Sequence, residues 1–183
     1  MSAEAIAFSH SAEYRKQFAA AIDGAKQAVL DHLSDPKPAV VADIDETILD
    51  NREEFASHPD FKWSQFDQWI QKANAPTLKP TADFLAWARK QGCAVFLITG
   101  RPEADRAATI QNLVRRGVVY DGLYMRPGAD IRGLAEDIKS NWRKQIEDMG
   151  FHIVTNIGDQ DSDLYGGFSM DCEKLPNKMY YIP

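Results

Sequence analysis

Apolar residues recur along the chain at two spacings, one typical of helices and the other of buried strands. From residue 11 to residue 34 they recur every three or four positions, which predicts an amino-terminal helix with Ser11 as its N-cap. Unbroken apolar runs rich in β-branched residues predict buried strands. These runs are 39–42, 93–99, 122–125 and 152–157, and a short extended piece is expected at 178–182.

Helical spacing returns between the strands. A helix capped by Thr81 is expected to end at Gly92, and another is expected from Pro102 or Glu103 to Arg116. The inner face of that second helix is expected to contain Ala107, Ile110, Leu113 and Val114. A third helix, which ends near residue 150, is expected from the helical spacing of Leu134, Ile138, Trp142 and Ile146. The alternation indicates an α/β fold, a Rossmann-like three-layer sandwich whose mainly parallel sheet has helices on both faces.

The stretch from about residue 52 to residue 80 lacks a strand pattern and is expected to form a small helical insertion after the first strand. Aromatic side chains gather there among polar ones: Phe55, Phe61, Trp63, Phe66 and Trp69. Such a cluster either packs the insertion internally or roofs a site at the end of the preceding strand. Internal packing is the more frequent use.

The composition limits the class of protein. A chain of 183 residues, 44% of them hydrophobic, suits a single globular domain over residues 1–183. The formal net charge of -6 argues against a nucleic acid polymer or an anionic membrane as a partner, because both would repel the protein. An anionic small molecule is compatible with this charge if a metal or local basic residues reverse the field at the site. The oligomeric state stays open.

The sequence also bears on location and redox state. No apolar run is long enough to cross a membrane, and the first residues lack the basic and long apolar parts of a signal peptide. The expected location is the cytoplasm for a full-length chain, and the periplasm or the exterior for a mature form whose leader was removed. Two cysteines are too few for a disulfide scaffold. Cys93 is expected to be a buried free thiol, and its pairing with Cys172 is left open.

Polar residues follow three of the predicted strands. Asp43 and Asp45 end the first strand, Thr99 ends the second, and Asp159 and Asp163 come just after the fourth. The carboxyl ends of parallel strands lie along one edge of a sheet, so these side chains are expected to converge there. The sequence therefore predicts a site built from carboxylates and a hydroxyl group.

Four carboxylates suit Mg²⁺, which binds one or two of them and takes its other ligands from water, carbonyl and phosphate oxygens. An aspartate left over can attack a phosphoryl group and form an aspartyl phosphate. Two anions about 4 Å apart repel by roughly 4 kcal/mol at an effective dielectric near 20, so a metal and a lysine are needed to offset the repulsion. Lys139 is available, with Arg143 one turn later. Arg143 equally suits a solvated helix face, and Arg101 equally suits a structural salt bridge.

Other chemistries fit less well. Asp159, Asp161 and Asp163 have the spacing of a calcium loop, but such a loop has Gly at its sixth position and Glu at its twelfth, where this chain has Leu164 and Met170. The four histidines lack an Arg-His-Gly signature. Neither cysteine is followed by arginine at the spacing of a cysteine phosphatase. Histidine and cysteine phosphatase mechanisms are therefore not expected.

The motifs resemble, in order and spacing, those of the haloacid dehalogenase superfamily. Four segments carry the likeness: Asp43-Ile44-Asp45-Glu46-Thr47, Leu97-Ile98-Thr99-Gly100-Arg101, Lys139-Ser140 and Gly158-Asp159-Gln160-Asp161-Ser162-Asp163. More narrowly, Val41 to Asn51 resembles the class B and class C acid phosphatases and the plant vegetative storage proteins. Lys174 to Ile182 is similar to the plant branch of that group.

The resemblance implies roles for the catalytic residues. Asp43 is expected to be the nucleophile, with its other carboxylate oxygen on Mg²⁺. Asp45 is expected to act as general acid and then as general base, while its backbone carbonyl joins the metal. Thr99 is expected to hydrogen-bond the phosphoryl group, and Lys139 to hold that group beside the nucleophile.

The resemblance also implies metal and substrate contacts. Asp159 is expected to complete the metal shell and Asp163 to support it, so the predicted metal ligands are Asp43, Asp45, Asp159 and Asp163. The candidates for substrate binding are Gly100, Arg101 and Arg143.

The sequence thus predicts a Mg²⁺-dependent acid phosphatase that hydrolyses small phosphate monoesters through an aspartyl phosphate on Asp43. Two alternatives stay open: a phosphotransferase that passes the same phosphoryl group to an acceptor, and a storage or binding protein on a phosphatase scaffold. The presence of Asp43, Asp45, Lys139 and Asp159 favours an enzyme. Nothing in the insertion identifies the leaving group as a nucleotide, a sugar or an aryl group.

Overall fold

The structure, a computed structural model, describes residues 1–128 and 135–182. Within that part of the chain five strands form one sheet in the order β3-β2-β1-β4-β5, and every strand pairing is parallel. The strands are β1 (Pro38–Ala42), β2 (Ala94–Pro102), β3 (Gly122–Arg126), β4 (His152–Gly158) and β5 (Cys172–Lys174). The first strand of the sequence is therefore the central strand of the sheet.

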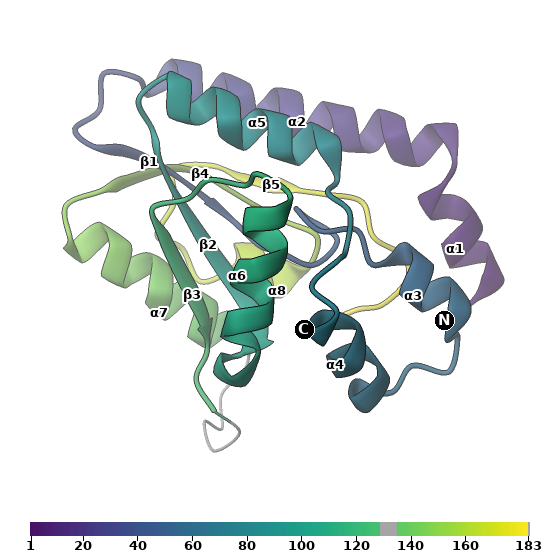
Figure 1. The fold of residues 1–183 in the computed structure, drawn as a ribbon. Helices are drawn as coiled ribbons and strands as arrows, with labels where there is room; N and C mark the ends of the chain where they lie inside the picture. Colours follow the sequence, from purple (N-terminus) through teal and green to yellow (C-terminus); the bar gives the residue numbers. More distant parts are fainter. Residues whose placement is uncertain (129–134, 183) are drawn as a thin grey trace.

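Helices cover both faces of this sheet. Figure 1 shows α2 and α5 side by side on one face and α7 on the opposite face. The helices are α1 (Ala3–Ser9), α2 (Ala12–Asp31), α3 (Arg52–Ser57), α4 (Trp63–Gln71), α5 (Lys79–Lys90), α6 (Arg106–Arg115), α7 (Ala135–Asp148) and α8 (Asp161–Leu164), with a 3₁₀ turn, η1 (Glu103–Asp105), before α6. The predicted α/β sandwich is confirmed.

The central strand shows why its sequence is apolar throughout. Val40 and Ala42 pack into the core on the side of α2 and α5, while Ala39 and Val41 pack into a second core on the side of α7. A strand buried on both faces cannot alternate apolar with polar residues. The unbroken run that predicted β1 is thus a consequence of its place in the middle of the sheet.

The helix predicted for residues 11–34 is shorter than expected. Ser11 does cap α2, because its hydroxyl oxygen accepts a hydrogen bond from the Tyr14 N–H at 3.0 Å. The helix ends at Asp31, however, and an additional helix, α1, precedes it. The side chain of Ser2 caps α1.

One predicted helix start is wrong, and one predicted helix face is wrong in part. Thr81 does not cap α5, which begins at Lys79 with Pro80 in its first turn, where the fixed φ of proline favours a helix. The buried face of α6 is only partly the predicted one, since Leu113 is buried, but the same face contains Thr109 and Asn112, and Val114 keeps 67% of its surface exposed. These polar side chains turn inward because buried groups pair with them, as described below. The predicted helix member Leu134 lies outside the described residues.

The extended piece expected at 178–182 is not a strand. The fifth strand is instead β5, which pairs with β4 from Asn156 to Gly158. The segment after β5 is held by side chains and not by a ladder of backbone bonds, as when the Ile182 N–H donates to the Gln160 side-chain oxygen at 2.8 Å.

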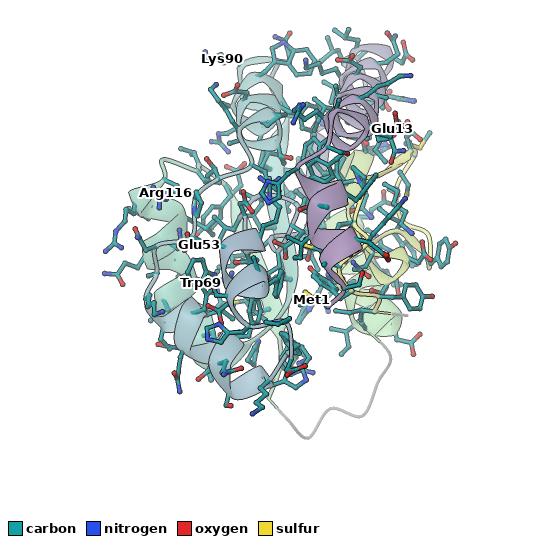
Figure 2. The ribbon with its side chains drawn as sticks, turned by 90° about the vertical axis from the view of Figure 1, so that its right-hand side faces the viewer. Met1, Glu13, Glu53, Trp69, Lys90 and Arg116 are labelled. Carbon is teal, nitrogen blue, oxygen red and sulfur yellow. The ribbon has the colours of Figure 1, made fainter. Side chains whose placement is uncertain are left out.

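The insertion contains α3 and α4, which pack against both ends of the chain. Phe55, Phe66 and Ile70 form a separate apolar cluster with Ala5 of α1 and Met179. Figures 1 and 2 show α1, which carries Met1 at its free end, beside this part of the molecule. The aromatic cluster of the insertion is therefore largely packing, although Trp63 remains 70% exposed.

Both cysteines carry free thiols, with Cys93 buried and Cys172 exposed, so the predicted buried thiol is confirmed. Within residues 1–128 and 135–182, none of the helices combines the length and the apolar character needed to span a bilayer.

Candidate active site

The turn after β1 places two aspartates at the carboxyl edge of the sheet. The Asp43 N–H donates to the Ile157 carbonyl at 3.0 Å, which continues the pairing of β1 with β4. The chain then folds back, because the N–H groups of Ile48 and Leu49 both donate to the Ile44 carbonyl at 2.8 Å. Glu46 adopts a positive φ of 55° within this turn. The sharp bend presents Asp43 and Asp45 beyond the strand end.

Lys139 lies between two carboxylates from distant parts of the chain. Its Nζ donates to Asp43 Oδ1 at 2.7 Å and also to Asp163 Oδ1, and all three side chains are buried. Burial would lower the pKa of Lys139, but the two carboxylates outweigh it and hold that pKa above its ordinary value. The two carboxylates therefore favour the charged form of Lys139, which contacts Asp43.

Asp163 approaches closely because β4 ends in glycine. A Cβ atom on Gly158 would lie 2.4 Å from the Cβ of Asp163, so no other residue fits there without displacement. Asp163 Oδ2 accepts the Gln160 N–H at 2.9 Å and caps the short helix α8. Both oxygens of Asp163 are thus held, one by the backbone and one by Lys139.

Three buried carboxylates define a candidate metal centre. Oxygen atoms of Asp43, Asp159 and Asp163 lie within 4.8 Å of one another. Burial first, and next the charge of Asp163, raise the pKa of Asp43 well above its ordinary value and that of Asp159 to about 7. One lysine cannot neutralise three carboxylates. The charge excess and the hard oxygen donors fit a divalent cation such as Mg²⁺.

Three neighbours fix the orientation of Asp159, and sequence reasoning assigned a role to none of them. Thr47 Oγ1 donates to Asp159 Oδ1 at 3.4 Å, and the side-chain amides of Gln160 and Asn177 donate to Oδ2. Thr47 and Gln160 lie within the quoted motifs, so their positions were a usable signal. Asn177 lies in an irregular segment within Lys174 to Ile182, whose likeness to the plant branch assigned it no role.

Arg101 forms a salt bridge with Asp45. The guanidinium reaches both carboxylate oxygens, with Nη2 at 2.6 Å from Oδ1 and Nε at 3.0 Å from Oδ2. Its Nη1 donates to Thr109 Oγ1 at 3.1 Å, which explains one polar residue on the inner face of α6. Burial would lower the pKa of Arg101, but the Asp45 carboxylate outweighs it and raises that pKa. Of the two interpretations left open for Arg101, the salt bridge is the one seen.

Asn51 and Glu46 complete the surroundings of Asp45. Asn51 Nδ2 donates to Asp45 Oδ1 at 2.9 Å and to Glu46 Oε2 at 3.2 Å. Glu46 also accepts the Asn51 backbone N–H at 2.7 Å and the Tyr180 hydroxyl at 3.0 Å. Burial, followed by the charges of Asp45 and Asp159, raises the pKa of Glu46 well above its ordinary value.

The second strand supplies the hydroxyl group expected at this edge, although β2 continues past Thr99, its predicted end, to Pro102. Thr99 is buried, and its Oγ1 accepts the Arg101 N–H at 3.1 Å. Gly100 is exposed, and a Cβ atom there would meet nothing within 4 Å. The backbone at Gly100 is thus open to an incoming group.

Arg143 is buried and faces the loop after α8. Its guanidinium donates to three backbone carbonyls, with Nη1 2.6 Å from that of Asp163, Nε 2.8 Å from that of Gly167, and Nη2 close to that of Tyr165. These contacts exclude the solvated helix face that was one interpretation of Arg143. They make it a support for α8, which carries Asp163, and for the loop after α8.

A parallel α/β sheet with aspartates at the end of its central strand and a buried lysine beside them is the arrangement of haloacid dehalogenase-like proteins. The chain belongs to the family described as HAD superfamily, subfamily IIIB (acid phosphatase), which matches residues 3–183. The resemblance inferred from the motifs is confirmed.

Similar proteins include enzymes and storage proteins. Acid phosphatase 1 of Solanum lycopersicum is 37% identical over 154 residues, covering 81% of this chain and 60% of its own length. Vegetative storage protein 2 of Arabidopsis thaliana is 29% identical, covering 78% of this chain and 56% of its own length. The chain thus spans about three fifths of the length of these curated relatives.

Among solved structures, the class C acid phosphatase from Bacillus anthracis superposes with a TM-score of 0.82 at 25% sequence identity. The match covers 97% of this chain and 84% of the bacterial one. The fold described above is therefore that of a class C acid phosphatase across nearly all of its length.

Proposed function

We propose that this protein is a Mg²⁺-dependent acid phosphatase that hydrolyses small phosphate monoesters through an aspartyl phosphate on Asp43. The observation that carries the proposal is the contact of Lys139 with Asp43 and Asp163, beside Asp159. A nucleophilic carboxylate, a fixed cation and spare oxygen ligands are the parts that phosphoryl transfer requires. The family membership supports the same assignment.

In the first step, a carboxylate oxygen of Asp43 attacks phosphorus while the bond to the ester oxygen breaks. The leaving oxygen takes a proton from Asp45, so the alcohol departs neutral and Asp45 becomes a carboxylate. In this proposal Lys139 and the Thr99 hydroxyl bind the phosphoryl oxygens. Arg101, which pairs with Asp45, holds it beside the reaction.

In the second step, Asp45 removes a proton from water as the water oxygen attacks the phosphorus of the aspartyl phosphate. The bond from phosphorus to Asp43 breaks, phosphate forms, and both aspartates return to their starting states. Asp43, Asp159, Asp163 and the main-chain carbonyl of Asp45 would hold a divalent cation, which when bound would supply positive charge to offset the repulsion between phosphate and carboxylate.

The test is hydrolysis of p-nitrophenyl phosphate and a panel of other phosphomonoesters, with Mg²⁺ or with EDTA. We expect Asp43→Asn to lower kcat by about a thousandfold or more, because the substitution removes the nucleophile and keeps its shape. Asp83→Asn, an exposed aspartate on α5, is the matched control and should retain full activity.

Two outcomes would contradict the proposal. Activity of Asp43→Asn close to that of the wild type would exclude Asp43 as nucleophile. A folded wild-type protein that turns over no phosphomonoester with Mg²⁺ would instead favour a storage or binding protein, as the names of some relatives suggest.

A further inference from the structure

The side chain of Asn51 connects the helical insertion to Asp45. Asn51 is fully buried just after the turn that follows β1. Its Nδ2 donates to Asp45 Oδ1 and Glu46 Oε2, and its Oδ1 accepts the indole N–H of Trp69 at 2.8 Å. Trp69 belongs to α4 of the insertion and is labelled in Figure 2. The Asn51 side-chain amide thus connects α4 of the insertion with the carboxyl groups in the turn after β1.

The chemistry of these neighbours allows only one orientation of the amide. The indole N–H of Trp69 can only donate, so it requires the oxygen of Asn51. Asp45 Oδ1, which also accepts from the Arg101 guanidinium, requires its nitrogen. A flipped amide would place its oxygen against Asp45 Oδ1 and its NH₂ against the indole N–H. Trp69 therefore helps to fix which atom of Asn51 faces Asp45.

The amide in turn distinguishes the two oxygens of Asp45. Oδ1 accepts from Asn51 Nδ2 and from Arg101 Nη2, with Nε of the same arginine at 3.2 Å. Among the described residues, Oδ2 has one hydrogen bond, from Arg101 Nε at 3.0 Å. The Asp45 side chain keeps 18% of its surface exposed, against 2% for Arg101. Oδ2 is thus the oxygen with free capacity for a proton.

We infer that Asn51 is a positioning residue for Asp45, that Trp69 of the insertion fixes the Asn51 amide, and that Asp45 consequently presents Oδ2 to the leaving group. The inference rests on the proposed phosphatase function and adds two residues to it. In the step concerned, the bond from phosphorus to the ester oxygen breaks and that oxygen takes the proton from Oδ2. Neither Asn51 nor Trp69 exchanges a proton in this step.

The experiment compares aryl phosphates whose leaving groups differ in basicity, from dinitrophenyl phosphate to phenyl phosphate. A good leaving group departs without a proton, whereas a poor one needs the acid. The parameter kcat/KM reports this step, because it covers events up to the departure of the first product. Loss of acid positioning should therefore steepen the dependence of kcat/KM on leaving-group basicity.

Trp69→Phe is the central variant, since it keeps an aromatic ring and removes the indole N–H. General acid catalysis contributes about 10²-fold to 10⁴-fold, so a misoriented acid should lower kcat/KM for phenyl phosphate by about tenfold. For dinitrophenyl phosphate the loss should stay within about twofold. Asn51→Ala should give the same pattern with a larger loss for phenyl phosphate.

Trp142→Phe is the matched control. The indole N–H of Trp142 is buried and has no hydrogen-bond partner among the described residues, so its removal breaks no such bond. This variant should keep the wild-type dependence on leaving group. Thermal melting of each variant verifies that it is folded, and Trp69→Phe decides the matter if Asn51→Ala does not fold.

The outcomes separate the inference from the proposed function. If the wild-type protein turns over no phosphomonoester with Mg²⁺, aryl phosphates included, the proposed function fails and the inference fails with it. If the wild-type protein is active but Trp69→Phe has an unchanged dependence on leaving group, the inference alone is wrong. An equal loss with every ester would likewise overturn it, because a merely structural defect does not discriminate between leaving groups.

Discussion

At the scale of single residues, Asp159 has the environment that responds most directly to protons and metal. It is buried next to Asp163, and these two influences raise its pKa to about 7. Hydrogen bonds from Asn177 and Gln160 oppose the increase without cancelling it. A divalent cation at this position would favour the charged form in the same way as any nearby positive charge.

This environment predicts how the stability of the metal-free protein varies with pH. An unfolded aspartate has a pKa of about 3.9, so between about pH 4 and pH 7 the folded protein binds more protons at Asp159 than the unfolded chain. The free energy of unfolding should therefore fall as the pH rises, by about 1.4 kcal/mol per pH unit for one such group. Urea unfolding in EDTA across this range measures the slope.

Two further measurements test the assignment of that slope. Asp159→Asn should reduce the slope in EDTA, because it removes the titrating group. Mg²⁺ should raise the melting temperature more at about pH 7.5 than at about pH 5, since a metal ligand must be deprotonated. Stability in EDTA that increases with pH through the whole range would contradict the prediction.

At the scale of elements, α7 contributes two residues that hold parts of the site in place. Lys139 contacts the two carboxylates, and one turn later Arg143 holds the carbonyls of Asp163, Tyr165 and Gly167. Gly166, which has a positive φ of 85°, lies between two of these carbonyls. The arginine thus fixes an irregular loop that has few backbone hydrogen bonds of its own.

We expect Arg143→Ala to destabilise the protein by about 3 kcal/mol or more, because each buried carbonyl left unpaired costs about 1–3 kcal/mol. Urea denaturation measures this change. Lys144→Ala is the control on the same helix, since Lys144 is exposed and pairs only with Asp148 in the described structure. A loss below about 1 kcal/mol, together with a large rise in KM, would instead point to contact with substrate.

The faces of α6 illustrate what helical spacing misses. The apolar pattern predicted Val114 inside, yet the inner face contains Asn112, whose side chain pairs with both the N–H and the carbonyl of Ala75 at 2.9 Å. Ala75, near the end of the insertion, is buried, so its backbone N–H and carbonyl require hydrogen-bond partners. Asn112 on α6 supplies both, and the local sequence of α6 does not indicate this requirement.

At the scale of the whole molecule, the candidate site combines the turn after β1 with the final segment of the chain. Asp159 accepts hydrogen bonds from Thr47, just after β1, and from Asn177, after β5. Tyr180, from the same final segment, donates to Glu46 in the turn after β1. The final segment therefore lies against the site and orients its carboxylates.

Asn177→Ala should weaken Mg²⁺ binding by about tenfold to a hundredfold, because partners that orient a metal ligand have effects of this size. Titration calorimetry measures the affinity. Lys178→Ala is the neighbouring control, since Lys178 is exposed and lies over the ring of Phe8. Equal Mg²⁺ affinity in Asn177→Ala and the wild-type protein would show that Asp159 does not depend on this contact.

The sequence by itself determined the first four strands, their alternation with helices, and the order of Asp43, Asp45, Thr99, Lys139 and Asp159 along the chain. Apolar runs and helical spacing are local, and parallel strands necessarily end at one edge. For that reason the convergence of these residues was predictable before any coordinates.

Only the tertiary structure decided which partner each polar group takes. It paired Arg101 with Asp45, turned Arg143 toward backbone carbonyls, and joined Trp69 to Asn51. Each choice depends on how segments far apart in sequence pack together and on which buried groups then lack a hydrogen bond. Residue spacing does not contain that information. The side chains at the carboxyl edge of the sheet were therefore predictable from the sequence, and the residues that hold them in place were not.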